Sequence, residues 1–146
     1  MSHQHTISRG VSCQGVGLHT GLNICLTLKP APINHGIVFR RTDINPPAPV
    51  AATPENVQDT RHATTIGKDG IEVRTIEHLM AALAGMGIDN CLIELDGPEV
   101  PAMDGSARPW VELLQRAQRK RQFAPKTFLK VKERIVVSDG TRFLQL

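Results

Sequence analysis

Glu77 and His78 are the neighbouring residues whose side chains are best suited to do chemistry together. An imidazole can ligate a metal ion, and a carboxylate beside it can take a proton from metal-bound water. The order is Glu-His, and the two-histidine helix motif HExxH is absent. Glu77 could also have only a structural role, because the helix dipole stabilises a glutamate in the first turn of a helix. The pair therefore raises metal-assisted hydrolysis as a hypothesis and leaves a purely structural role open.

A helix is expected to carry this pair, with Thr75 as its N-cap and Gly85 just past its end. One side is an apolar stripe that should face the core: Ile76, Leu79, Met80 and Leu83. The opposite side combines a histidine with small residues: His78, Ala81, Ala82 and Gly85. Small side chains would let a metal, a substrate or another element approach closely. The alternative is that the alanines are simply good helix formers on a solvated face.

The other candidate residues carry weaker signals. His19 lies in the segment GVGLHTG at 15–21, whose last interval is one residue too long for the dinucleotide motif GxGxxG. No capped helix is expected after it, so the segment predicts a tight turn that presents His19 and not a Rossmann site. No two histidines have the metal-ligand spacing of three or four residues, and the three cysteines form no CxxC pair. Asp104 is expected to be a loop hydrogen-bonder.

The surrounding segments predict an α+β fold, with a two-layer domain in which a β-sheet packs with helices. Strands are expected over 24–28, 37–40, 63–66, 71–74 and 90–95, with a hairpin turn at Asp69-Gly70. A second helix should begin near Ser106 and place apolar residues at helical spacing, from Trp110 to Ala117. It is expected to end in a cluster of cations: Arg116, Arg119, Lys120 and Arg121. Three prolines in 46–49 exclude a helix or a central strand there.

The pattern changes after Pro125, where apolar residues alternate with polar ones and predict an amphipathic strand. A turn at 138–141 and a return strand from Arg142 to Leu146 should follow. A two-stranded hairpin is marginal alone in water, and its open edge and apolar face would be a liability. We therefore expect residues 1–124 to form an N-terminal domain. Residues 125–146 are expected to be the first hairpin of a second, similar domain that is cut off.

Composition and charge exclude several classes of protein. The chain has 146 residues, of which 40% are hydrophobic, so a core can be buried. Aromatic residues make up only 3%, which argues against stacking platforms for single-stranded nucleic acid. No apolar run approaches the ~18 residues of a transmembrane span, and no secretory signal is recognisable. We therefore expect no membrane span and a cytoplasmic location.

The charge is unevenly distributed along the chain. Residues 1–115 hold 8 basic and 12 acidic side chains, a net of −4, whereas residues 116–146 hold 9 and 2, a net of +7. A basic tail is one mark of a nucleic-acid binder. Here Lys130, Lys132 and Arg134 alternate with other residues along an expected strand, which favours a solvated strand face. We expect no nucleic-acid partner.

Five linked motifs make the sequence much more specific. In chain order they are GVGLHTG at 15–21, RRTD at 40–43, TIEHL at 75–79, AALAG with GIDN at 81–90, and MDGSA at 103–107. Together they resemble the UDP-3-O-acyl-N-acetylglucosamine deacetylase family, the zinc hydrolases of lipid A biosynthesis. The resemblance covers nearly the whole chain.

The resemblance implies a two-domain protein with its active site between the domains. By position, His78 becomes a ligand of Zn²⁺ and Glu77 the general base. The family's other zinc ligands, a His and an Asp, come from the second domain, so that missing domain and a UDP-linked acylated glucosamine are the expected partners. This chain stops roughly where the second domain begins, and we expect it to be inactive alone. Segment 60–65 differs from family members that carry Cys there, so His62 receives no role, and His19 is expected to be structural.

A second hypothesis is a non-catalytic folded fragment or interaction module that needs a partner chain. The abrupt end inside an expected strand motivates it. Such a module would pair stoichiometrically with a separate second half.

Overall fold

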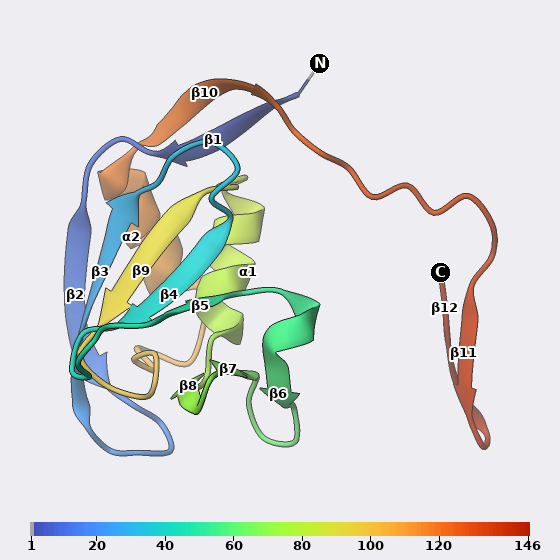
Figure 1. The fold of residues 1–146 in the computed structure, drawn as a ribbon, viewed down its shortest axis with the longest axis horizontal. Helices are drawn as coiled ribbons and strands as arrows, with labels where there is room; N and C mark the ends of the chain where they lie inside the picture. The colour runs from blue at the N-terminus through green and yellow to red at the C-terminus, as the bar shows by residue number, and fades with distance from the viewer. Residues whose placement is uncertain (1) are drawn as a thin grey trace.

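A five-stranded sheet forms the central layer of the computed structural model, which describes residues 2–146 (Figure 1). Its strands are β2 (Val11–Val16), β3 (Asn23–Pro30), β9 (Cys91–Leu95), β4 (Ile37–Arg41) and β5 (Pro49–Ala51), in that order across the sheet. All neighbours are antiparallel except β4 and β9, which are parallel. Alternate residues of β3 are buried, as expected for a sheet with one covered face. The proline-rich segment leads into the edge strand β5, in agreement with the sequence analysis.

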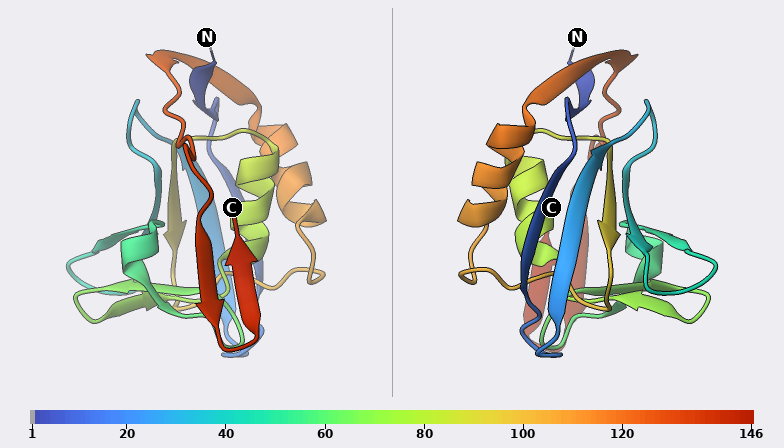
Figure 2. Two further views of the ribbon diagram at one scale, coloured as in Figure 1. Left: turned by 90° about the vertical axis from the view of Figure 1, so that its right-hand side faces the viewer. Right: turned by 90° about the vertical axis from the view of Figure 1, so that its left-hand side faces the viewer.

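Two helices lie on the same side of this sheet (Figure 2). They are α1 (Glu77–Gly85) and α2 (Arg108–Ala117). The core between the layers contains fully buried side chains from all three parts: Phe39, Leu79, Leu83, Ile93, Trp110 and Leu114. Full burial of one such side chain stabilises the fold by about 1.5–3 kcal/mol. The predicted α+β, two-layer architecture is confirmed. Within residues 2–146, neither helix has the length and apolar character needed to span a membrane.

A three-stranded sheet lies beside the start of α1 (Figure 1). It consists of β6 (Val57–Asp59), β7 (Thr65–Lys68) and β8 (Ile71–Val73), and a short 3-10 helix, η1 (Pro54–Asn56), precedes it. Asp69 and Gly70 join β7 to β8 with φ angles of 53° and 80°. Two consecutive positive φ values are typical of a tight hairpin turn, so the predicted Asp-Gly hairpin is confirmed.

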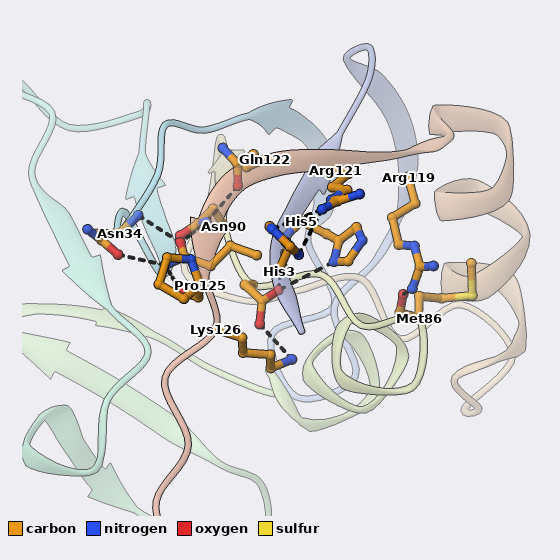
Figure 3. A network of polar contacts seen from close by, with 12 residues as sticks. His3, His5, Asn34, Met86, Asn90, Arg119, Arg121, Gln122, Pro125 and Lys126 are labelled. Carbon is orange, nitrogen blue, oxygen red and sulfur yellow. Dashed lines mark hydrogen bonds and ion pairs between the residues drawn. The ribbon is translucent and has the colours of Figure 1, made fainter. Parts of the chain in front are cut away.

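The two ends of the folded part pair with each other, as β1 (His3–Ile7) with β10 (Arg119–Pro125). Figure 3 shows the polar network that ties this pair to the rest of the fold. Asn90 Nδ2 donates to Gln4 Oε1 and to Gln122 Oε1, both at 2.8 Å. Gly36 N–H donates to Asn90 Oδ1 at 2.8 Å. One buried amide thus joins both chain ends to the central sheet.

Lys126 is the last residue held by this network. Its Nζ lies 2.7 Å from Asp89 Oδ1, and the His5 N–H donates to the other oxygen of Asp89. Beyond it, residues 127–146 are exposed throughout, and the hairpin of β11 (Val136–Asp139) and β12 (Arg142–Gln145) stands apart from the two layers (Figure 1). The predicted turn and return strand are confirmed. The first strand begins only at Val136, because residues before 135 have no strand partner among those that the structure describes.

Two expectations about which residues the helices contain and bury are wrong. The cations from 119 to 121 belong to β10 and do not end the second helix, because Gln118 has a φ of 60° that stops α2 and the following backbone pairs with β1. Ala82 is buried in the core, whereas the sequence placed it on the side opposite the core. The reason is that α1 contacts α2 as well as the sheet, so two of its faces are covered.

Candidate active site

Glu77 is the first residue of α1, and its carboxylate is held in place by one backbone contact. The Thr64 N–H donates to Glu77 Oε2 at 3.0 Å. The side chain is half-buried, and the helix N-terminus favours its negative charge. The second oxygen of the carboxylate accepts no hydrogen bond within residues 2–146. The carboxylate is therefore oriented and keeps lone pairs free to accept a proton.

His78 follows on the same turn and is half-buried. No hydrogen bond to its ring nitrogens occurs among the residues that the structure describes. The described residues also contain no cluster of three or more His, Cys, Asp and Glu side chains that could hold a metal ion. A catalytic zinc site needs about three protein ligands. This part of the chain therefore supplies one available imidazole and does not by itself fit a complete zinc site.

Two hollows border the segment that contacts Glu77. One of about 470 Å³ has Glu77 at its edge and is otherwise lined mainly by apolar groups: Ala52, Pro54, Val57, Ile66, Ile76 and Met80. The other, of about 700 Å³, is lined by charged and polar groups: His19, Asp59, Arg61, His62, Glu72 and Arg74. The segment 62–66 separates them: residues 62, 63 and 65 line the charged hollow, and residues 64 and 66 line the apolar one. His19 thus lies across the segment from Glu77 and does not line the hollow that Glu77 borders.

The charged hollow contains two local ion pairs. Arg61 Nη2 lies 2.9 Å from Asp59 Oδ2, and Arg74 Nη2 lies 3.0 Å from Glu72 Oε2. The hydrogen bonds from the Arg61 side chain and backbone hold the pKa of Asp59 well below its ordinary value. The positive and negative groups of this wall therefore balance one another at neutral pH.

Thr75, the predicted N-cap, does not cap α1. Ile76 occupies the N-cap position and makes no side-chain cap. Thr75 has a φ of 59°, and its hydroxyl donates to Glu99 Oε1 at 2.7 Å. The prediction failed because Thr75 lies one residue before the N-cap position, has a positive φ, and directs its side chain to Glu99, 24 residues further along the chain.

Glu99 is a residue of this region that sequence reasoning missed. Its side chain is buried, with 0% relative exposure. It accepts hydrogen bonds from the N–H groups of His19 at 3.0 Å and Thr20 at 2.8 Å, and from the Thr20 hydroxyl at 2.8 Å. The sequence offers one faint signal, a lone acid between prolines in PEVP at 98–101. The turn at 15–21 does present His19, as the glycine pattern predicted.

Asp104 and Cys91 are explained by a local hydrogen bond and by burial, respectively. Asp104 Oδ1 accepts hydrogen bonds from the N–H and the hydroxyl of Ser106, so it is a loop hydrogen-bonder as predicted. Cys91 is buried, and burial raises the pKa of its thiol to about 12. A thiol with so high a pKa is a poor nucleophile at neutral pH.

Comparison with known proteins identifies the family. Residues 4–146 match the family model LpxC, described as UDP-3-O-acyl N-acetylglycosamine deacetylase. The chain belongs to this family. A relative from Myxococcus xanthus, named UDP-3-O-acyl-N-acetylglucosamine deacetylase, is 56% identical over 96% of this chain and 45% of its own length. Relatives of the same name from Marinobacter nauticus and Vibrio cholerae are each 49% identical over 97% and 99% of this chain.

The chain spans about half the length of these deacetylase relatives, 45–48% in the three cases. The family match covers nearly all of this chain, whereas about half of each relative has no counterpart in it. In this deacetylase-family chain, the two residues singled out by the resemblance, Glu77 and His78, lie together at the start of α1. Their catalytic and metal-binding roles stay predictions.

The pKa of Glu99 makes a prediction about acid stability. Burial alone would raise this pKa, but the hydrogen bonds from His19, Thr75 and Thr20 outweigh burial and lower it below its ordinary value of 4.5. A carboxyl with a lowered pKa in the folded state stabilises the fold fully above its ordinary pKa and loses that contribution as the pH falls through the lower, folded value.

We therefore expect the free energy of unfolding to decrease below about pH 4.5, with a smaller decrease in a Glu99→Gln variant. Denaturant titrations of both proteins between pH 7 and pH 3 measure the difference. Parallel curves for the two proteins would contradict this assignment of the acid-sensitive group.

Proposed function

We propose that this chain is the N-terminal portion of a zinc-dependent hydrolase that removes the acetyl group from UDP-3-O-acyl-N-acetylglucosamine in lipid A biosynthesis. The observation that carries the proposal is the placement of Glu77 and His78 on the first turn of α1. The carboxylate of Glu77 is oriented by Thr64, while the imidazole of His78 has no hydrogen-bond partner within residues 2–146. The family match and the names of the relatives supply the substrate.

In this proposal Glu77 is the general base. Its Oε2 accepts from the Thr64 N–H, so the carboxylate is fixed before a water molecule arrives. A fixed carboxylate beside the reacting water can remove a proton as the water attacks the amide carbonyl, while residues of the second domain would protonate the leaving amine. Bound zinc would supply polarisation of the carbonyl and of the water.

His78 is proposed as one zinc ligand, and a His and an Asp from a second domain as the others. One imidazole does not hold zinc tightly, so we propose that this 146-residue chain is inactive by itself. We also propose that a domain boundary lies near residue 125 and that the protein is cytoplasmic.

The test compares the chain alone with the chain joined to the C-terminal portion of the Vibrio cholerae relative, which is 49% identical over the shared part. Both proteins are assayed for acetate release from the UDP-linked substrate and for bound zinc. We expect acetate release and about one zinc per molecule from the joined protein only. A folded joined protein that binds zinc but releases no acetate would contradict the proposal.

An interaction module is the second candidate function, and the exposed hairpin favours it. Its apolar side chains are largely uncovered: Val137, Phe143, Leu144 and Leu146 are 64–71% exposed. Such a surface is typical of a site that another chain covers. Mixing this chain with the separate C-terminal portion of the relative should then give a 1:1 complex by light scattering. A complex that releases no acetate, under conditions where the joined protein also releases none, would favour the module over the enzyme.

A further inference from the structure

Glu99 is a buried ion without a counter-ion. Its side chain is 0% exposed, and none of the ion pairs within residues 2–146 includes it. All its hydrogen-bond donors are neutral groups of His19, Thr20 and Thr75. A charge buried in this way stays favourable only while these donors remain in place. The carboxylate therefore fixes the positions of the groups that donate to it.

The donors come from two segments that would otherwise be independent. Three belong to the turn at 17–21, and the fourth is the hydroxyl of Thr75, two residues before Glu77. Thr75 is β-branched and has a φ of 59°, a strained conformation that persists only where the surroundings hold it. Its bond to Glu99 is thus placed where the chain turns into α1.

The backbone around Glu99 is also fixed on both sides. The Arg74 N–H donates to Pro98 O at 2.9 Å, and the Val100 N–H donates to Arg74 O at 3.0 Å. Residue 74 therefore lies between two backbone contacts that flank Glu99. The backbone beside Glu99 is thus joined to Arg74, and the Glu99 carboxylate adds a second connection through the hydroxyl of Thr75.

The backbone of the turn at 17–21 lies so close to the Glu99 carboxylate that no side chain fits between them at Gly17. A Cβ atom at Gly17 would lie 2.5 Å from Glu99 Oε2 and 2.4 Å from Thr20 Oγ1. Only glycine fits at this point, so the turn is shaped around the carboxylate.

We propose that Glu99 is a positioning residue, whose carboxylate fixes the His19 turn against Thr75 and thereby sets the placement of Glu77 and His78 at the start of α1. The part of this proposal that concerns turnover rests on the function proposed above. The part that concerns placement is independent of it.

Placement is tested in the 146-residue chain by amide NMR. Thr75→Val removes the hydroxyl and keeps the branched shape, whereas Thr75→Ser keeps the hydroxyl. We expect Thr75→Val and Glu99→Gln to shift the amide resonances of residues 17–21 and 75–78 together, and Thr75→Ser to leave those of 17–21 in place. Unchanged resonances of Glu77 and His78 in Glu99→Gln, or unchanged resonances of residues 17–21 in Thr75→Val, would overturn the proposal. If Glu99→Gln does not fold, the two Thr75 variants decide the outcome.

Turnover is tested in the joined protein. A misplaced general base lowers the rate of the chemical step more than it weakens substrate binding, so Glu99→Gln should lower kcat about 10- to 100-fold with KM changed less than about threefold. The control is Asp89→Asn, because Asp89 accepts from the His5 N–H and pairs with Lys126 and thus belongs to a different set of contacts. We expect it to leave kcat within about twofold.

The outcomes separate the two proposals. An active joined protein whose kcat is unaffected by Glu99→Gln and Thr75→Val overturns the positioning role alone. An inactive joined protein contradicts the proposed function, while the NMR comparison still decides placement.

Discussion

Replacement of Glu77 by glutamine in the joined protein should lower kcat by about 10²- to 10⁴-fold, the usual contribution of a general base. The glutamine carbonyl oxygen can still accept the Thr64 N–H, which lies 3.0 Å from Glu77 Oε2, so the side chain keeps its orientation. It loses only the ability to take a proton. Acetate release measures kcat, and metal analysis should show zinc bound as in the unsubstituted protein.

The control for this prediction is Glu112→Gln. Glu112 lies on α2, is exposed, and pairs with Arg108 one helical turn earlier at 3.0 Å. The Glu112→Gln substitution removes one negative charge from the surface and should leave kcat unchanged. Near-normal turnover of Glu77→Gln would exclude the general-base role. Loss of zinc together with activity would show instead that Glu77 acts on the metal.

The second large effect is expected at Trp110, which is fully buried in α2 between the layers. Trp110→Ala should lower the free energy of unfolding by about 3–5 kcal/mol, because it leaves a cavity in the core. That is a large share of the about 5–15 kcal/mol that stabilises an ordinary domain. Denaturant titration of the 146-residue chain, followed by circular dichroism, measures the difference.

Trp110→Phe is the matched variant. The indole Nε1 of Trp110 is buried and has no hydrogen-bond partner in the described residues, so the native side chain already carries a desolvation penalty. Phenylalanine removes that unpaired donor and keeps an aromatic ring. We expect it to cost much less than alanine, about 1 kcal/mol. Equal losses for the two variants would contradict the expectation that an aromatic ring alone preserves most of the packing.

Local signals in the sequence determined much of this fold. Segment 24–28 was expected to be a strand, and it lies within β3, where alternate residues are buried. Asp69-Gly70 can adopt two positive φ values, so the hairpin between β7 and β8 was predictable from two residues. Glu77 and His78 are neighbours in the chain, and a helix necessarily places them on one turn. Each of these features depends on residues a few positions apart.

Tertiary structure decided the features that depend on distant partners. The cations at 119–121 form a strand and not a helix end, because β1, more than 110 residues earlier, offers them backbone partners. Ala82 is buried because α2 packs on α1, which the spacing within α1 could not reveal. Thr75 lies before the N-cap position and directs its side chain to Glu99, 24 residues away. A buried carboxylate satisfies its charge with whatever donors the fold brings to it, and only the folded chain determines which donors those are.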